Sequence, residues 1–280
     1  MRLIRHGSPG QERPGLIAPD GSRRDLSSVI EDLRGAALGD ESLERLRALD
    51  PAALPLVDDA VRLGPPVAGV GKFICIGLNY ADHAAEAGMA VPSEPIVFMK
   101  ATSAISGPND ALEIPRGSTS TDWEVELGVV IGKRAKYIEE DQALEHVAGY
   151  LCVNDVSERD FQTRRQGQWT KGKSHDTFGP IGPWLCTRDE VRDPQQLRLW
   201  CRVDGQMRQD GSTATMVYGV AHLVAYLSRF MTLEPGDIIA TGTPPGVGMG
   251  FNPPVFLRPG QEISLGIEGL GEQCYSCTPA

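Results

Sequence analysis

Two carboxylates, Glu124 and Glu126, interrupt an otherwise apolar segment at residues 123–131, WEVELGVVI. Residues two apart on a β-strand point to the same face of a sheet, so a strand here directs both carboxylates the same way. They repel each other unless a cation lies between them, and oxygen ligands suit a hard divalent ion such as Mg²⁺, Mn²⁺ or Ca²⁺. The alternative is an ordinary solvated face, although Gly128 and Val130 continue that face without polar groups.

Asp155 is a third carboxylate, and it ends the apolar run AGYLCVND. One interpretation makes it the N-cap of a following helix, with Glu158 three positions further on as in a capping box. The other makes it a third ligand of the same ion, because strand ends are where a scaffold presents such groups. The two roles are compatible, and the spacing leaves both open.

His83 and Glu86, in NYADHAAEAG, are three residues apart and lie side by side if this segment is helical. A carboxylate that orients an imidazole makes it a better general base, able to take a proton from water. Such a pair is also common on ordinary helix surfaces. His175 lies in the polar loop GKSHDTFGP, and the sequence assigns it no role.

The glycine-rich segment ATGTPPGVGMG, residues 240–250, invites comparison with a phosphate-binding loop. It lacks the Gly-Lys-Ser/Thr ending of such a loop and the helix that should follow it. A nucleotide site is therefore not predicted there.

The chain has 280 residues, of which 41% are hydrophobic, and its 37 acidic and 27 basic residues give a net charge of −10. This length supports one large domain with at most a small additional unit. The negative charge argues against nucleic-acid binding, which depends on neutralising phosphates. With no apolar run near the roughly 20 residues that cross a bilayer and no signal peptide, we expect no membrane association and a cytoplasmic location. Cys274 and Cys277 form a lone CxxC, too few ligands for a structural zinc site.

Alternating and apolar segments predict the elements that position these groups. The predicted strands are 72–78, 94–100, 123–131, 197–203 and 262–268, with hairpin turns at Pro19–Gly21 and at Asp204-Gly205. The predicted helices are 40–50, 139–147, 157–166 and 215–230. Strands without regular helix alternation favour a mixed, β-rich α+β fold over a doubly wound sheet. Prolines and glycines at 51–66 predict a small N-terminal domain with its linker at 1–66, followed by a main domain at 67–280.

Several motifs occur in an order that resembles the fumarylacetoacetate hydrolase family. They are GLNYADHAAE, FMK, DWEVELGVVIGK, GYLCVNDVSERDFQ, KGKS, FGPIGPW and ATGTPPGVG, and they span about residues 70–270. The resemblance implies a mixed β-roll with a smaller N-terminal domain, in a homodimer. The first seventeen residues and the segment VYGVAHLVAYLSRFMTLEPGD are similar to a narrower bacterial branch, whose members are labelled 2,4-diketo-3-deoxy-L-fuconate hydrolases or ureidoglycolate lyases.

The resemblance also implies roles for individual residues. Glu124, Glu126 and Asp155 match the family's Mg²⁺ or Mn²⁺ ligands, and His83 with Glu86 matches its water-activating dyad on a lid segment. Lys173 matches the active-site lysine. The residues that match substrate-contacting positions are Arg159, Gln162 and Thr243.

The resemblance, with which these residue types agree, implies a metal-dependent hydrolase that cleaves a C–C bond in a 2,4-diketo acid of the acylpyruvate type. Products would be pyruvate, or a related 2-oxo acid, and a carboxylic acid. Decarboxylases and isomerases on the same metal site are one alternative, although they need no water-activating dyad. Ureidoglycolate lyase is another, and a non-catalytic protein that binds 2-oxo acids is a third.

Overall fold

A mixed β-sheet forms the centre of the computed structural model, which describes residues 1–86, 88 and 90–280 except the side chains of His83 and Ala85. Twelve strands of this described part belong to it. Their order is β4 (Leu56–Val57), β3 (Arg23–Asp25), β2 (Arg13–Ile17), β1 (Arg2–His6), β14 (Gly179–Thr187), β12 (Val147–Asn154), β11 (Val125–Ile131), β17 (Ile238–Ala240), β6 (Phe73–Gly77) and β7 (Ile96–Lys100), with β5 (Leu63–Gly64) beside β1 and β8 (Ile105–Ser106) beside β14. Only β6–β17 and β8–β14 are parallel pairs among them.

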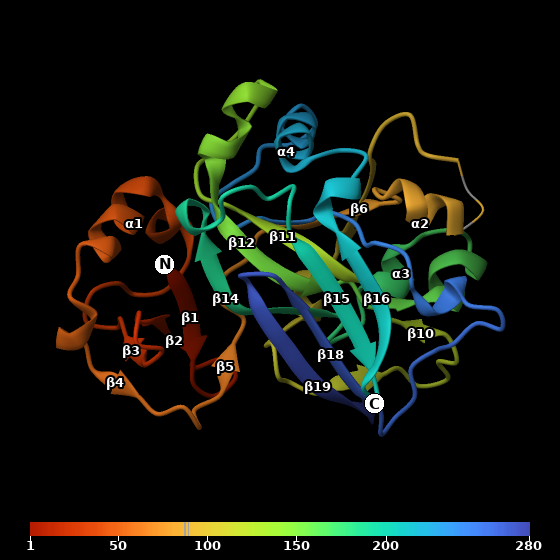
Figure 1. Cartoon of the computed structure of the whole chain (residues 1–280), viewed down its shortest axis with the longest axis horizontal. Helices are drawn as coiled ribbons and strands as arrows, with labels where there is room; N and C mark the ends of the chain where they lie inside the picture. The colour runs from red at the N-terminus through yellow and green to blue at the C-terminus, as the bar shows by residue number, and fades with distance from the viewer. Residues whose placement is uncertain (87, 89) are drawn as a thin grey trace.

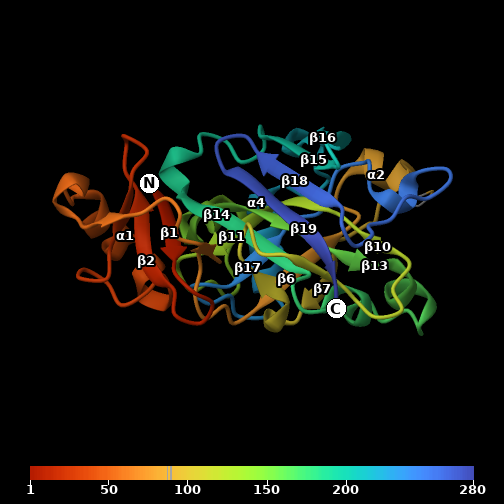
Figure 2. The ribbon, with the colours of Figure 1, turned by 90° about the horizontal axis from the view of Figure 1, so that it is seen from below.

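A second sheet lies over one face of the first (Figures 1 and 2). Its order is β16 (Gln206–Ser212), β15 (Arg198–Val203), β18 (Glu262–Ile267), β19 (Gly271–Pro279) and β9 (Leu112–Ile114). Val125, Leu127 and Val129 of β11 pack in one fully buried cluster with Leu199 and Leu265 of this sheet. Burial of this apolar surface drives the two sheets together. The β-rich mixed fold predicted from the sequence is confirmed.

Short helices surround the sheets (Figure 1). They are α1 (Asp40–Arg47), α2 (Ala81–Glu86), α3 (Thr170–Lys173) and α4 (Val220–Ser228), with a π-helical turn at Asp160–Arg164. Turns of 3-10 helix occur at Gly35–Leu38, Pro51–Ala53, Thr102–Ala104, Glu140–His146, Arg188–Glu190, Thr213–Thr215 and Gly248–Gly250. A two-stranded ribbon joins β10 (Thr121–Asp122) to β13 (Ser157–Glu158).

The predicted strands and both hairpin turns are confirmed, but three predicted helices are wrong in part. The helix predicted at 215–230 is shorter, because α4 spans only Val220–Ser228. Residues 140–146 form a 3-10 helix instead of an α-helix. The predicted helix 157–166 begins as β13, because Ser157 and Glu158 pair with Asp122 and Thr121. Pairing with a distant strand here outweighs the local helical pattern.

The N-terminal strands β1–β5 extend the main sheet at one side of the molecule (Figure 1). Strand β1 pairs with β14, with Leu3 opposite Leu185. Leu3, Leu16 and Leu43 join Val130 in a second apolar cluster on the other face of β11. Strand β11 is thus buried on both faces, whereas a domain boundary near residue 66 stays a prediction.

Two further sequence features now have a structural setting. Cys274 and Cys277 lie on strand β19, where the first is exposed and the second buried, and neither forms a disulfide. Residues three apart on a strand point to opposite faces, which explains the difference. None of the described helices has the length and apolar character needed to cross a bilayer.

Substitution Gly149→Ala tests the close pairing of β12 with β14. A Cβ atom at Gly149 would lie 2.1 Å from the carbonyl oxygen of Cys186, so the strands must separate. We expect the free energy of unfolding to fall by about 1–3 kcal/mol, measured by urea denaturation. Gly39→Ala is the control, because its Cβ would meet nothing closer than 3.4 Å; only the weaker preference for alanine at the N-cap of α1 lowers its stability. Equal losses in both variants would contradict this packing.

Candidate functional site

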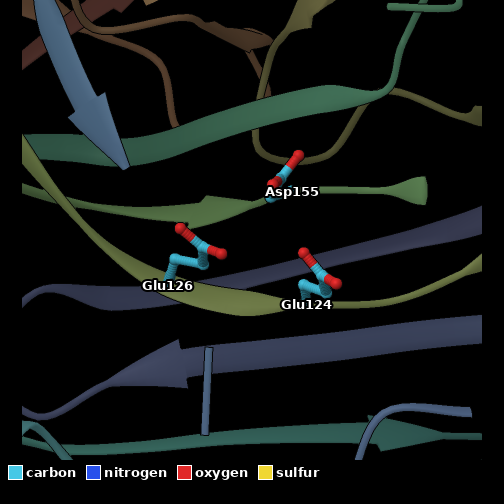
Figure 3. A group of neighbouring side chains, drawn as sticks. All are labelled: Glu124, Glu126 and Asp155. Atoms are coloured by element: carbon cyan, nitrogen blue, oxygen red, sulfur yellow. The ribbon is translucent and has the colours of Figure 1, made fainter. Parts of the chain in front are cut away.

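Three carboxylates meet where β11 and β12 lie side by side (Figure 3). Glu124 directly precedes β11, Glu126 is its second residue, and Asp155 directly follows β12. Oxygen atoms of all three lie within 4.8 Å of one another. Their exposed fractions are 6%, 1% and 0%, so the alternative of a solvated face is wrong.

Strand register explains this meeting point. Val125 pairs with Asn154, and the backbone N–H of Asp155 donates to the carbonyl of Glu124 at 2.9 Å. The predicted N-cap role of Asp155 is wrong, because the residues after it form β13 instead of a helix. Its side chain accepts from two lysine ammonium groups instead.

Lysine and arginine side chains surround the carboxylates. The Lys173 Nζ donates to Glu124 Oε2 at 2.7 Å and to Asp155 Oδ2 at 2.6 Å. Lys100 Nζ lies 2.6 Å from Asp155 Oδ1, and Arg159 Nη2 lies 2.7 Å from Glu124 Oε1. Burial lowers the pKa of the Lys173 ammonium, but Asp155 and Glu124 outweigh it and raise the pKa overall, so Lys173 stays charged.

Glu126 differs from its two neighbours because no cationic side chain of the described residues forms an ion pair with it. Its Oε2 accepts the N–H of Gly242 at 2.8 Å. Burial raises the pKa of this carboxyl well above its usual range, and the charges of Asp155 and Glu124 raise it further. A divalent ion among the three carboxylates would remove this repulsion.

Asp122 is a buried carboxylate that our sequence analysis missed. It accepts from Arg159 Nε at 2.8 Å and from the N–H groups of Gly248 and Met249 at 2.6 and 3.0 Å. Burial, opposed by the Arg159 charge, raises the pKa of Asp122. The aspartate therefore ties Arg159 to the glycine-rich loop. Its place at the start of DWEVE was the available signal.

A cavity of about 110 Å³ opens beside these groups. Charged and polar side chains line one part of it, namely Glu124, Glu126, Arg159, Gln162, Thr163, Lys173 and Thr243. Apolar side chains line the rest, namely Ile76, Leu78, Phe98, Trp169 and Met249. The site can thus hold a small anionic molecule that has one apolar portion.

Gln162 and Thr243, predicted to contact substrate, both line the cavity. Gln162 Oε1 accepts from Arg159 Nη1 at 3.2 Å. The Thr243 hydroxyl donates to the carbonyl of Val125 at 2.8 Å and accepts from Gln209 Nε2 at 2.7 Å. Because its one proton is donated to Val125, Thr243 is held as an acceptor toward the cavity in this arrangement.

The predicted dyad lies on α2. The side chain of His83 falls outside the described part of the structure. Glu86 is exposed, and its carboxylate accepts the N–H of Gly246 at 3.0 and 3.1 Å, which connects α2 to the glycine-rich loop. The His175 ring contacts the rings of Phe161 and Phe178, and burial lowers the pKa of His175 despite nearby Glu158.

Comparison with known proteins adds independent information. The family model "Fumarylacetoacetate (FAA) hydrolase C-terminal" matches residues 72–276. A protein of Burkholderia multivorans, named only as a hydrolase, is 65% identical over 274 residues, covering 98% of this chain and 97% of the relative. Maleylpyruvate hydrolase from Sphingobium sp. SYK-6, solved with manganese(II) and pyruvate, is 31% identical with a TM-score of 0.82 and full coverage of both chains. The 2-hydroxyhepta-2,4-diene-1,7-dioate isomerase from Mycobacterium marinum is 33% identical with a TM-score of 0.76, covering 100% of this chain and 98% of that one.

Substitution Glu126→Gln distinguishes the repulsion among the three carboxylates from their binding of a divalent ion. Without divalent ions, we expect a higher unfolding temperature, because a neutral amide replaces a carboxylate beside two others and still accepts from Gly242. At Mn²⁺ concentrations a hundred times the Kd, wild type should gain about 2.7 kcal/mol and the variant far less. Thermal unfolding with and without Mn²⁺ measures both effects. Glu113→Gln, which removes an exposed carboxylate on β9, is the control. Equal Mn²⁺ stabilisation of the two variants would contradict ligation by Glu126.

Proposed function

The chain belongs to the fumarylacetoacetate hydrolase family, and from this premise we propose that it is a divalent-metal-dependent hydrolase of 2,4-diketo acids. It cleaves the C–C bond of an acylpyruvate-type substrate to pyruvate and a carboxylic acid. The observation that carries this proposal is the buried triad of carboxylates, two of which, Glu124 and Glu126, line a cavity together with Lys173 and Arg159.

The donor set fits Mg²⁺ or Mn²⁺. It contains only carboxylate oxygens, from Glu124, Glu126 and Asp155, which are the ligands that hard cations prefer. Within the described site, four buried carboxylates face three buried cationic side chains; the carboxylates are Asp122, Glu124, Glu126 and Asp155, and the cations are Lys100, Arg159 and Lys173. A divalent ion turns this negative excess into a positive one, which suits an anionic substrate.

The proposed reaction uses a bound metal ion together with side chains of this chain. When bound, the ion supplies Lewis-acid polarisation of the substrate carbonyl. His83, oriented by Glu86, removes a proton from water, and the resulting hydroxide adds to that carbonyl. The C–C bond then breaks and its electron pair leaves as an enolate, whose charge the Lys173 ammonium stabilises. Return of the proton taken from water to the enolate carbon gives pyruvate. Arg159 binds the substrate carboxylate and Gln162 assists it, while Thr243 borders the same space.

The apolar part of the cavity bears on the acyl half of the substrate. Phe98 and Trp169 meet edge to face at 5.1 Å between ring centroids, and Ile76 and Leu78 continue this wall. Such a wall leaves substrate hydroxyl groups without partners, so it favours a small apolar acyl group. 2,4-Diketo-3-deoxy-L-fuconate is the alternative substrate, supported by the narrower sequence resemblance.

A homodimer in the cytoplasm is part of the proposal. Strand β7 is at the edge of the main sheet and exposes Val97 and Met99, with exposed fractions of 36% and 38%. An edge strand with exposed apolar side chains is a surface that a second copy can cover. The proposed partners are thus another copy of this chain and a small 2-oxo or 2,4-diketo acid.

Isomerisation or decarboxylation on the same metal site is the second candidate activity. The likeness to an isomerase of this fold favours it. The presence of both His83 and Glu86 favours hydrolysis instead, because neither alternative reaction needs an activated water. Ureidoglycolate lyase activity and non-catalytic binding of 2-oxo acids rank below these.

Pyruvate release from a substrate panel tests the proposed reaction. The panel comprises simple acylpyruvates, 2,4-diketo-3-deoxy sugar acids, oxaloacetate and ureidoglycolate, each with Mg²⁺, with Mn²⁺ or with EDTA. We expect metal-dependent release from acylpyruvates together with an equimolar carboxylic acid. Decarboxylation of oxaloacetate without acylpyruvate cleavage would favour a decarboxylase or isomerase on the same metal site. Turnover of none of them, with binding of 2-oxo acids retained, would favour a binding protein.

Substitution His83→Ala tests the water-activating dyad. We expect hydrolysis to fall by about 10²–10⁴-fold, the usual contribution of a general base, while Mn²⁺ affinity stays near that of wild type. Steady-state kinetics and calorimetric titration with Mn²⁺ measure the two quantities. His222→Ala is a suitable control, because His222 lies on α4 and is paired with Glu140 away from the cavity. Near wild-type hydrolysis in His83→Ala would exclude the dyad.

A further inference from the structure

Lys100 lies behind the carboxylate triad instead of in the cavity. It is the last residue of β7, its side chain is fully buried, and it is absent from the described residues that line the cavity. Its ammonium donates to Asp155 Oδ1 at 2.6 Å and to the backbone carbonyl of Val156 at 3.0 Å. The second bond ties the ammonium to the backbone of Val156, in the short link between β12 and β13, and so opposes its movement with a rotating carboxylate.

Two lysines divide the two oxygens of Asp155 between them. Lys173, which lines the cavity, binds Oδ2 at 2.6 Å, whereas Lys100 binds Oδ1 from the buried side. A carboxylate that chelates an ion through both oxygens must turn both of them toward it. Lys100 opposes this, since turning Oδ1 into the cavity would leave the buried ammonium with the Val156 carbonyl but without a charged partner.

We propose that Lys100 is a positioning residue that restricts Asp155 to one ligand oxygen and thereby selects Mg²⁺ or Mn²⁺ over Ca²⁺. The inference rests on the proposed metal-dependent function. Ca²⁺ is larger, takes more oxygen ligands and readily accepts bidentate carboxylates, whereas Mg²⁺ requires compact octahedral geometry with single oxygens. Holding one carboxylate to a single oxygen therefore penalises Ca²⁺ more than its smaller competitors.

A purely neutralising role for Lys100 makes a different prediction. Removing its charge would strengthen the binding of every divalent cation by the same Coulomb energy, because Mn²⁺ and Ca²⁺ carry equal charge. The ratio of the two dissociation constants would then stay constant. Only a change in the ligand geometry of Asp155 alters that ratio.

Calorimetric titration of the full-length Lys100→Met protein with Mn²⁺ and with Ca²⁺ tests the inference. We expect the ratio Kd(Ca²⁺)/Kd(Mn²⁺) to fall by about tenfold relative to wild type, a typical effect for a residue that orients a ligand. Lys72→Met is the matched control, because Lys72 also pairs with a buried aspartate, Asp237, at 2.6 Å but at a different place. Its ratio should equal that of wild type.

The outcomes distinguish the inference from the function on which it rests. An unchanged ratio in a Lys100→Met protein that binds Mn²⁺ would overturn the positioning role and leave the metal site intact. Wild-type protein that binds neither ion would overturn the metal-dependent function itself.

A second measurement needs no variant and covers the case in which Lys100→Met does not fold. Infrared difference spectra of ¹³C-aspartate-labelled wild type on Mg²⁺ binding should show the wide separation of carboxylate stretches that marks one-oxygen ligation. A narrow, bidentate separation would overturn the inference.

Discussion

The antiparallel pairing of β11 with β12 is the constraint on which the site depends. Val125 opposite Asn154 places Glu124 and Asp155 next to each other at the end of the two strands, and the Asn154 side chain accepts the N–H of Glu124 at 2.9 Å. The same register sends Val125 and Leu127 into the apolar cluster between the sheets. A slip by one residue would exchange the two faces and direct Glu126 into that cluster. Core packing therefore fixes the position of the carboxylates.

Burying these carboxylates requires charge balance from distant parts of the chain. Lys100 comes from the end of β7, Lys173 from the end of α3, and Arg159 from the turn before the π-helix. A buried charge without a partner costs several kcal/mol, so these elements must all be in place before the site is stable. The glycine-rich loop completes the arrangement at Gly242, whose φ of +98° directs its N–H to Glu126. A Cβ atom there would lie 2.7 Å from the Cβ of Asn79, which leaves room only for glycine.

Local sequence patterns predicted the strands and the carboxylate pair, because in these segments the order of apolar and charged residues decides the structure. Alternation of apolar residues identified the strands, and the pair Glu124 and Glu126 stood out because charges are rare in a buried strand. Where long-range contacts decide, the patterns failed: Asp155 has the spacing of a helix N-cap, yet the two residues that would begin the helix pair with β10. Lys100 and Asp122 were missed because a single charge beside an apolar run is ordinary. Only the fold shows that each is buried against an opposite charge.

Most of the apolar wall comes from other elements than the carboxylates, and β7 connects the two sides, because it carries both Phe98 of the wall and Lys100, which binds Asp155. The ends of β11 and β12 carry the carboxylates, whereas β6, β7 and the turn at Trp169 carry the apolar wall. At Gly77 a Cβ atom would lie 2.8 Å from the Trp169 ring, so glycine is what lets the indole close this wall. Under the proposed function, substitutions in the wall would change which acyl group fits while leaving the three carboxylates in place. Apolar walls discriminate mainly by size, so substrates whose acyl groups differ slightly in size should differ only modestly in rate. A larger difference is expected where a polar group of the substrate is left without a partner.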